Sequence, residues 1–350
     1  MRNAKLKKIP NDFIVTECST LPHQSCIENH YYYYYTMQKC GYSTFDAIRI
    51  LSNITGINKE NIGYAGLKDE DGITEQIISL TEEIPSEIVT ELYELCAKDK
   101  QKYIYLQYKG RGELPIQIGN LLGNTFQITV RMLSKEIVNE LRNLQKTQLF
   151  FLNYYDTQRF GIPNYPQVAH KIGEKLLSKD YDNALKLFLV SGNEETSDYD
   201  VNQSAKSFFD TLDIRKQTFF MNAFSSFQWN QRLGEILFEV FEHRVKSSLD
   251  EGIPFYYLEE QEKLIELLKH YPSLEFIKHK SEGGKIFDRI SSRPTVIQTF
   301  IENIKVDKDE LYSDSLKMTV SFYLPSGCYA TMAIKQWIFF LQKNKKERMR

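Results

Sequence analysis

The stretch YAGLKDEDGITEQ, residues 64 to 76, places a lysine beside a run of acids in a turn of small residues. Gly66 and Gly72 flank the charged part of the turn, and glycine and aspartate favour turns because their backbones tolerate tight conformations. A solvated loop is the ordinary interpretation of such a stretch. The alternative is a carboxylate held on a loop beside a cation, as in enzymes that keep an acid charged and aimed. The stretch alone leaves both interpretations open.

Composition bounds the class of protein. The chain has 350 residues, of which 42% are hydrophobic, and this suffices for one large or two moderate domains. No apolar run reaches the roughly 18 residues that a membrane span needs, and the start of the chain lacks the apolar segment of a signal peptide. The five cysteines form no CxxC pair and the six histidines have no metal-ligand spacing, so we expect neither disulfides nor a metal. We predict a cytoplasmic monomer without membrane or metal contacts.

The charge is balanced overall but not locally. The net charge of −2 gives no global indication of nucleic-acid binding, yet both ends of the chain are basic. Such ends are commonly solvated tails, but they would contribute to a phosphate-facing surface if both belonged to one domain. Aromatic residues make up 13% of the chain, which supplies the core and also stacking platforms for bases. The basic residues at the ends are Arg2, Lys5, Lys7, Lys8, Lys343, Lys345, Lys346, Arg348 and Arg350.

Strand patterns occur near both ends of the chain. Residues 124–133 alternate cleanly, with Phe126, Ile128 and Val130 on one face. The tyrosine run within 30–39 is interpreted as a strand that is buried on one side. The expected strands are residues 12–18, 30–39, 101–110, 124–133 and 316–327.

Helical patterns dominate the middle of the chain. A capping box of Ser43 and Asp46 predicts a helix that stops at Gly56. From about residue 165 to 295 the apolar residues recur at helical spacing, above all in 181–192 and 218–249, and a last helix is expected over 329–343. Strands at both ends around a helical middle favour an α+β fold, in which a mixed-sheet domain is interrupted by a helix-rich insertion.

Further stretches combine polar or aromatic residues with small turns. Each alone has a structural explanation, since glycine turns after strands and buried tyrosines are ordinary. The stretches are PNDF (10–13), GNLLGNTF (119–126), NYYDTQRFG (153–161), SSFQWNQRL (225–233) and LPSGCYAT (324–331).

Taken in order with residues 64–76, these stretches resemble the TruD family of pseudouridine synthases, from about residue 6 to 340. That family shows a P-x-D-F entry, an AG-x-KD loop followed by T-x-Q, a G-x-L-x-GN-x-F strand, an NY(F)G-x-QRFG block and a closing LP-x-G before an aromatic and AT. The resemblance implies an α+β catalytic domain with a mixed, mainly antiparallel sheet, made of residues 1–171 and 296–350. Residues 172–295 would form the helix-rich insertion domain.

The resemblance makes Asp69 the catalytic carboxylate. Breaking the bond between uracil and ribose leaves an electron-deficient sugar, which a carboxylate attacks or stabilises. An elimination route, in which the carboxylate accepts a sugar proton, stays equally open. The adjacent Lys68 is a natural counter-charge for Asp69. Because neighbouring residues on an extended segment point opposite ways, Lys68 facing phosphate or another acid also stays open. No cofactor is implied, since the isomerisation is redox-neutral.

The resemblance also assigns substrate contacts. Phe13 and Tyr329 match the substrate-contacting aromatics of the family, and Asn153 matches its base-contacting amide, whose donor and acceptor suit a uracil edge. Tyr155 stands where the family usually has Phe, and Lys7 matches a basic residue near the active site. The supporting residues of the matched motifs are Thr74, Gln76 and Arg159.

Some positions depart from the family pattern. Asp156 replaces a glycine, which is costly if the position needs a positive φ. Glu70 and Asp71 follow Asp69 where a basic residue is common, and Asn11 stands where an acid is frequent. More carboxylates near the site would weaken the binding of a polyanion.

The predicted function is therefore that of a pseudouridine synthase acting on RNA, with tRNA as the expected substrate and uridine 13 as the site that the family implies. One alternative is an enzyme that makes pseudouridine from a free nucleotide or nucleoside. Another is a catalytically inactive RNA-binding module, against which the joint presence of Asp69, Thr74, Gln76 and Asn153 argues.

Overall fold

The computed structural model describes residues 4–21, 32–96, 102–117, 120–141, 144–162, 164–282 and 284–348. These residues form two compact units: the first comprises Met1–Gln148 and Thr299–Gly327, and the second comprises Leu149–Gln298 and Cys328–Arg350. Each unit is described by itself. The predicted features that lie outside the described residues are Arg2, Cys26, His30, Tyr31, Gln101, Gly119, Arg350 and the side chains of residues 343–348.

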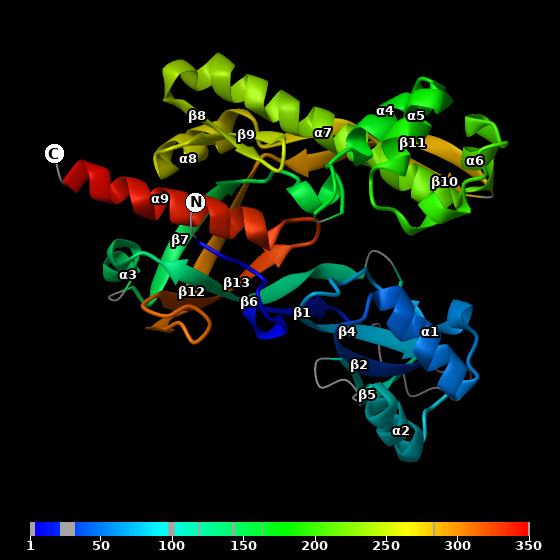
Figure 1. Ribbon diagram of the computed structural model, residues 1–350. Coiled ribbons are helices and arrows are strands. Elements are labelled where there is room, and N and C mark those ends of the chain that lie inside the picture. The colour runs from blue at the N-terminus through cyan, green and yellow to red at the C-terminus, as the bar shows by residue number, and fades with distance from the viewer. Residues whose placement is uncertain are drawn as a thin grey trace. The chain divides into compact units, whose positions relative to one another are not determined.

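A mixed sheet is the main element of the first unit. The described strands follow the order β5-β2-β4-β1-β6-β13-β12-β7, with β3 paired to β4 (Figure 1). β1 and β4 are parallel, whereas β1–β6, β2–β4, β2–β5, β3–β4, β6–β13 and β12–β13 are antiparallel. The predicted α+β fold with a mixed, mainly antiparallel sheet is confirmed. The strands are β1 (Phe13–Ser19), β2 (Tyr32–Cys40), β3 (Gly63–Tyr64), β4 (Ile73–Leu80), β5 (Tyr103–Gly112), β6 (Leu121–Leu133), β7 (Lys146–Leu152), β12 (Val296–Lys308) and β13 (Leu316–Pro325). Residues 149–152 of β7 and 296–298 of β12 belong to the second unit.

The described helices of the first unit are α1 (Thr44–Thr55), α2 (Ser86–Cys96) and α3 (Lys135–Leu141). The predicted start and stop of α1 are confirmed. The Ser43 hydroxyl accepts a hydrogen bond from the backbone N–H of Asp46, and Gly56 ends the helix with φ 75°.

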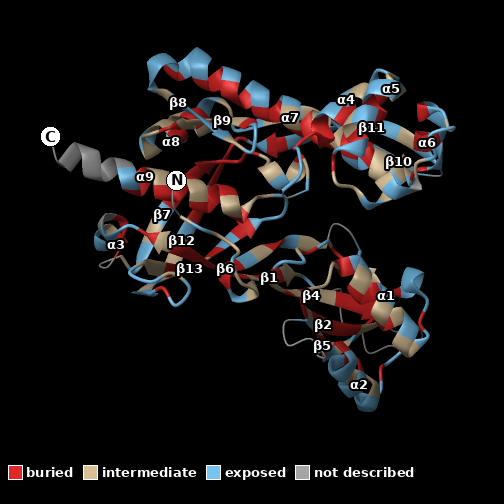
Figure 2. Cartoon of the chain, viewed as in Figure 1, coloured by how far each residue is buried: buried red, intermediate tan, exposed pale blue. Residues whose placement is uncertain are grey.

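The tyrosine strand β2 is buried on both faces, so the expected one-sided burial is wrong. β2 lies between β5 and β4, and most of its residues are buried (Figure 2). Tyr35 belongs to the core that α1 and α2 cover, and Tyr34 packs with Ala65 on the opposite face. Both hydroxyl groups are bonded: Tyr34 donates to the carbonyl of Leu114 at 2.7 Å, and Tyr35 accepts from the N–H of Ile84 at 2.9 Å.

The second unit is rich in helices, as predicted, but also contains two hairpins that the sequence patterns did not reveal. The helix expected over 218–249 ends at Phe241, and Glu242 follows with φ 45°. The residues beyond it pair as strands. The described helices are α4 (Ala169–Leu177), α5 (Tyr181–Leu189), α6 (Ala205–Thr211), α7 (Ile214–Phe241), α8 (Gln261–His270) and α9 (Ala330–Arg348). The hairpin strands are β8 (Val245–Asp250), β9 (Ile253–Leu258), β10 (Ser273–Glu282) and β11 (Lys285–Pro294).

Helices α4 and α7 approach each other closely at Gly173. A Cβ atom at this position would lie 1.9 Å from the carbonyl oxygen of Phe220, so only glycine permits the contact.

The boundaries of the two compact units differ from those of the predicted domains. The assignment of residues 172–295 to an insertion domain stays a prediction. Within the described part of the chain, no helix has the length and apolar character that a membrane crossing requires.

Candidate active site

Asp69 lies on the turn between β3 and β4, and the ammonium group of Lys7 is its ion-pair partner. Nζ of Lys7 is 2.7 Å from Oδ2 of Asp69. The Asp69 side chain is 39% exposed, whereas the Lys7 side chain is only 19% exposed. The carboxylate is thus compensated by a cation and still accessible to a ligand.

A chain of hydrogen bonds fixes the turn that carries Asp69. Gln76 on β4 is buried, donates to the carbonyl of Gly66 at 3.2 Å and accepts from the Thr44 hydroxyl at 3.0 Å. That hydroxyl in turn accepts from the backbone N–H of Lys68 at 2.9 Å. Gln76, which the sequence motif singled out, therefore positions the backbone next to Asp69.

Lys39, a fully buried lysine on β2, holds the same turn through backbone oxygens. Its Nζ donates to the carbonyls of Tyr42 at 2.8 Å, Lys68 at 3.3 Å and Asp69 at 2.8 Å. Burial lowers the pKa of Lys39 to about 8, although the nearby charges of Asp69 and Glu70 oppose the shift. Lys39 was not among the predicted site residues. The available signal was a lysine within a strand rich in tyrosine, because a lysine that such a strand buries needs specific partners.

Lys68 does not pair with Asp69. Its Nζ lies 2.7 Å from Oε2 of Glu17, and both side chains are buried. Of the two roles left open, Lys68 thus faces another acid, and Lys7 supplies the counter-charge. Thr74 is buried on β4, and its hydroxyl has no hydrogen-bond partner among the described residues. The supporting role of Thr74 stays a prediction.

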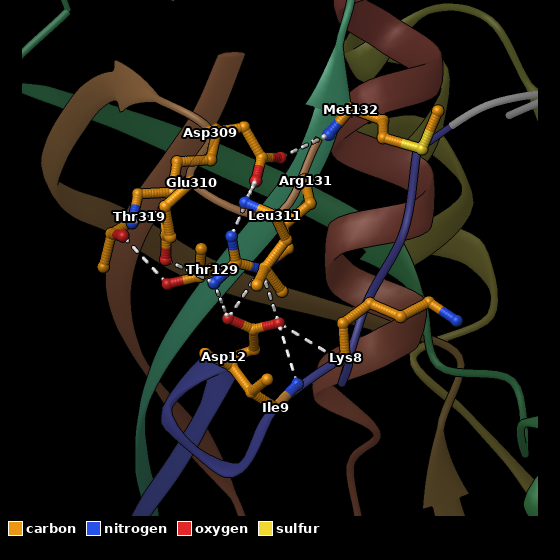
Figure 3. A network of polar contacts seen from close by, with 11 residues as sticks. Lys8, Ile9, Asp12, Thr129, Arg131, Met132, Asp309, Glu310, Leu311 and Thr319 are labelled. Atoms are coloured by element: carbon orange, nitrogen blue, oxygen red, sulfur yellow. Dashed lines mark hydrogen bonds and ion pairs between the residues drawn. The ribbon is translucent and has the colours of Figure 1, made fainter. Parts of the chain in front are cut away.

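A buried cluster of charges surrounds Arg131 on β6 (Figure 3). Its guanidinium contacts both carboxylate oxygens of Asp12, at 2.8 Å, and pairs with Asp309 at 2.8 Å and with Glu310 at 2.9 Å. The bonds from Arg131 are the largest cause that lowers the pKa of Glu310 to about 2. One buried cation thereby ties the start of the chain to the loop after β12.

This cluster fixes the N-terminal segment that carries Lys7. Asp12 also accepts from the backbone N–H of Lys8 at 3.0 Å and of Ile9 at 3.3 Å. Lys5 forms a backbone bridge with Arg131. Lys7 itself has φ 51°, a left-handed conformation that non-glycine residues rarely adopt. The unusual backbone at Lys7 is consistent with a residue held for function.

Phe13, directly after this segment, is buried beneath Lys7. Nζ of Lys7 lies 4.0 Å from the centre of the Phe13 ring. Gly72 of the Asp69 turn packs against the same residue, since a Cβ there would lie 2.3 Å from the carbonyl oxygen of Phe13. In this arrangement Phe13 contacts Lys7, and its contact with a substrate base stays a prediction.

The second unit brings Tyr155 and Tyr329 together in an aromatic cluster. Their ring centres are 6.1 Å apart, and Tyr155 also meets Trp229 at 5.9 Å and Phe276 at 6.3 Å. The guanidinium of Arg293 lies 3.9 Å from the centre of the Tyr155 ring. Burial raises the pKa of Tyr329 to about 12, so its hydroxyl stays protonated at neutral pH.

Asn153 is buried, and both ends of its amide are bonded inside the second unit. Oδ1 accepts from Arg293 at 2.8 Å, and Nδ2 donates to the carbonyl of Pro294 at 3.0 Å. Arg293 also donates twice to the backbone carbonyl of Asn153. Arg293, which the sequence analysis missed, therefore links Asn153 to Tyr155. The contact of Asn153 with a substrate base stays a prediction.

The backbone of Tyr155 is clamped by Asn230 on α7. Oδ1 of Asn230 accepts from the N–H of Tyr155 at 3.0 Å, and Nδ2 donates to its carbonyl at 2.9 Å. Arg159 donates to the hydroxyl of Ser226 on the same helix at 3.2 Å. The stretches 153–161 and 225–233 are thus joined side by side.

Asp156, the departure from the family glycine, fits its position. Its φ is −81°, so the position does not require the positive φ that would favour glycine. The Asp156 carboxylate accepts a hydrogen bond from the backbone N–H of Thr157. The carboxylate pairs with Lys335 at 2.6 Å and accepts from the Thr331 hydroxyl. Although burial opposes it, pairing with Asp156 and Asp250 raises the pKa of Lys335. The negative charge of Asp156 is thus compensated by Lys335, and the predicted weakening of polyanion binding stays a prediction.

The predicted site residues fall into two groups, one in each unit. In the first unit the structure assembles Lys7, Phe13, Lys68, Asp69, Thr74 and Gln76. In the second unit it assembles Asn153, Tyr155, Arg159 and Tyr329.

Comparison with known proteins gives consistent matches. A family model described as tRNA pseudouridine synthase D (TruD) matches residues 2–238. The probable tRNA pseudouridine synthase D 1 of Methanococcus maripaludis is 29% identical over 95% of this chain and 98% of its own length. The probable tRNA pseudouridine synthase D 2 of Methanocaldococcus jannaschii is 25% identical over 98% of this chain and 94% of its own length.

A solved structure shares the fold. The crystal structure of the putative tRNA pseudouridine synthase D (TruD) from Methanosarcina mazei superposes with a TM-score of 0.58 at 20% identity, covering 97% of this chain and 94% of that one. The family model covers more than half of the chain, and the near full-length relatives agree with it. The chain belongs to the TruD family of pseudouridine synthases.

Proposed function

We propose that this protein isomerises uridine to pseudouridine in tRNA, with Asp69 as the catalytic carboxylate and uridine 13 as the modified position that the family implies. The observation that carries the proposal is the contact of Lys7 with the exposed Asp69 carboxylate at 2.7 Å. A catalytic carboxylate needs a fixed backbone, a compensating cation and access for the sugar. Asp69 combines these features.

Both chemical routes begin at the same atoms. The Asp69 carboxylate either attacks C1′ of the ribose and forms an ester, or accepts a proton from the sugar, and in either case the C1′–N1 bond breaks and uracil leaves with the bonding electrons. Carbon 5 of the uracil then bonds to C1′, which releases the ester or is accompanied by return of the proton to the sugar. Carbon 5 loses its proton and N1 gains one, so the product is an isomer of the substrate. In both routes the carboxyl group is neutral in the intermediate, as an ester or as an acid. The Lys7 ammonium therefore stabilises the charged carboxylate before the first step and after the last.

The target base has to leave its stack, which costs a few kcal/mol, while aromatic stacking returns about 1–3 kcal/mol per base. Tyr155 and Tyr329 are the aromatic groups we propose for this contact, with Phe13 supporting Lys7. Asn153 contributes mainly by fixing Arg293 against Tyr155, and its amide donates to a uracil oxygen in the proposed complex. No cofactor takes part in the proposed reaction.

RNA is favoured over a free nucleotide as the substrate. The acidic departure at Asp156 is compensated by Lys335 within the second unit, so it does not argue against a polyanion. The proposal includes residues 172–295 as the family insertion, a cytoplasmic location and a monomeric enzyme.

The proposal is tested by incubating the purified protein with unmodified tRNA, with an unrelated structured RNA and with free UMP, and by mapping pseudouridine in each product. Pseudouridine at one tRNA position supports the proposal. Pseudouridine formed only from UMP would replace tRNA by a nucleotide as the substrate.

A further inference from the structure

The hairpin of β10 and β11 carries its basic side chains on one face. Lys278 pairs directly with Arg289, and Lys280 pairs with Phe287. Opposed residues of antiparallel strands share a face, and so do alternate residues along one strand. We call this surface the basic face. It consists of Phe276, Lys278, Lys280, Phe287, Arg289 and Arg293, and at the end of the hairpin the opposed Glu282 and Lys285 lie on the same side.

The cations at the centre of the basic face lack partner acids. Lys278, Lys280 and Arg289 are exposed, and in the described part of the chain no carboxylate lies within ion-pair distance of any of them. Asp288 lies on the opposite face, where it contacts His279 at 2.7 Å. The pKa of Lys278 is lowered by partial desolvation and by the charges of Lys280, Arg159 and Arg289. An anion that binds beside cations crowded in this way lowers their mutual repulsion, so its binding is favoured.

The basic face is continuous with the aromatic cluster of the second unit. Arg293 lies over Tyr155 at 3.9 Å, and Phe276 meets Tyr155 at 6.3 Å. Further along the hairpin, Phe287 is 52% exposed beside Lys280. Cations therefore alternate with aromatic rings, starting from the tyrosine proposed to receive the base. This combination is typical of surfaces that follow a nucleic-acid strand.

Helix α7 holds the hairpin in place from its other face. The backbone N–H and carbonyl of His279 bond to the side chain of Asn222, both at 2.8 Å. The His279 ring contacts the Ser225 hydroxyl at 3.3 Å. These contacts use side chains outside the basic face, which leaves the basic face available on a fixed support.

From this charge pattern and its continuity with Tyr155, we propose that the basic face binds the phosphodiester backbone of the RNA next to the target nucleotide, with Phe287 stacking on a flanking base. The inference rests on the proposed function, in that the substrate is RNA. It goes further by assigning the binding to three cations: Lys278, Lys280 and Arg289.

The test compares two triple variants of the full chain. The first is Lys278→Gln, Lys280→Gln and Arg289→Gln. The matched control is Lys171→Gln, Lys246→Gln and Lys269→Gln, which removes as many positive charges from exposed positions elsewhere in the second unit. The Kd for unmodified tRNA is measured over a series of salt concentrations, together with KM and kcat for pseudouridine formation.

We expect the hairpin variant to bind tRNA roughly ten- to hundred-fold more weakly, and the slope of log affinity against log salt to become shallower by about 2. KM should rise more than kcat falls. The control variant should change Kd by less than about three-fold, because its substituted lysines lie away from the bound RNA and affect binding only through the long-range electrostatic field of the protein. A charge-conserving variant, Lys278→Arg, Lys280→Arg and Arg289→Lys, should bind with nearly the original affinity.

A hairpin variant with the original Kd and salt slope would overturn the inference, as would equal losses in the hairpin and control variants. The proposed function is judged separately from the original protein. If that protein forms pseudouridine in tRNA and the hairpin variant binds normally, only this inference fails. If the original protein binds tRNA through the basic face but forms no pseudouridine, the inference holds and the proposed function fails.

Discussion

The ammonium of Lys39 lies 2.8 Å from the backbone carbonyl oxygen of Asp69, while Lys7 lies 2.7 Å from its carboxylate. One lysine thus fixes the backbone of the proposed catalytic residue, and another compensates its charge. Lys68, the immediate neighbour in sequence, pairs with Glu17 instead. The geometry of the site therefore depends on cations brought in from β2 and from the N-terminal segment.

Replacing Lys7 should impair catalysis more than folding. Lys7→Met removes the charge next to Asp69 but keeps an apolar stem over Phe13. We expect kcat for pseudouridine formation to fall roughly hundred-fold, as when one charged donor is lost from an active site. The neighbouring Lys8→Met is the control, because among the described residues Lys8 contacts the Arg131 cluster only through its backbone N–H, which donates to Asp12. Equal kcat values for the two variants would refute the role of Lys7.

Lys39 should make stability depend on pH in a defined direction. Its pKa is about 8 in the folded protein, against an ordinary value of 10.5. Between these pH values the unfolded chain binds more protons, so the free energy of unfolding rises with pH. At about 1.4 kcal/mol per unit, the gain is roughly 3 kcal/mol.

The gain is isolated by comparison with Lys39→Met. The free energy of unfolding is measured for both proteins by urea titration from pH 7.5 to 10.5. Over this pH range, the free energy of unfolding of the original protein should rise by roughly 3 kcal/mol relative to that of the variant. A difference that is constant with pH would show that folding does not lower the pKa of Lys39.

Arg131 should be essential for stability. Arg131→Met leaves the carboxylates of Asp12 and Asp309 buried without their cation. Breaking a buried ion pair in this way costs about 3–5 kcal/mol. Arg232→Met removes an exposed pair with Glu235 and should cost less than about 1 kcal/mol. Urea unfolding of both variants checks the prediction, and similar costs would contradict it.

Restoring the family glycine at Asp156 should destabilise this protein. Asp156→Gly removes the partner of Lys335 and Thr331. Among the described residues it leaves Asp250 as the one ion-pair partner of the partly buried Lys335 ammonium. We expect a loss of about 2–4 kcal/mol in the free energy of unfolding. Adding Lys335→Met should recover part of the loss, because the ammonium is then gone as well. If Asp156→Gly were neutral or stabilising, the ion pair would not hold the two motifs together.

Much of the fold was predictable from local patterns. The expected strands have counterparts in β1, β2, β5, β6 and β13, and helices α1 and α9 formed where periodicity and capping indicated them. The hairpins β8–β9 and β10–β11 were missed. Strands β8, β10 and β11 are mostly exposed, so the apolar alternation that marks a half-buried strand is weak in them. Strand β9 has no exposed residue, but it contains Pro254, and proline within a run argues against a strand.

The residues of the candidate site were predictable only where a motif carried them. Lys7 and Asp69 are 62 positions apart, and Arg293 lies 140 positions from Asn153. Pairings over such separations depend on tertiary packing. The two-sided burial of Tyr34 and Tyr35 has the same origin, since only the sheet order makes β2 a central strand.

The central claim is that the Asp69 carboxylate performs the isomerisation, and its most direct test is pseudouridine mapping in tRNA treated with Asp69→Asn. Asp71→Asn, in the same turn and exposed, is the matched control. We predict that Asp69→Asn still binds tRNA but forms no detectable pseudouridine, whereas Asp71→Asn retains the activity of the original protein. Pseudouridine formed by Asp69→Asn at the original rate would contradict the account.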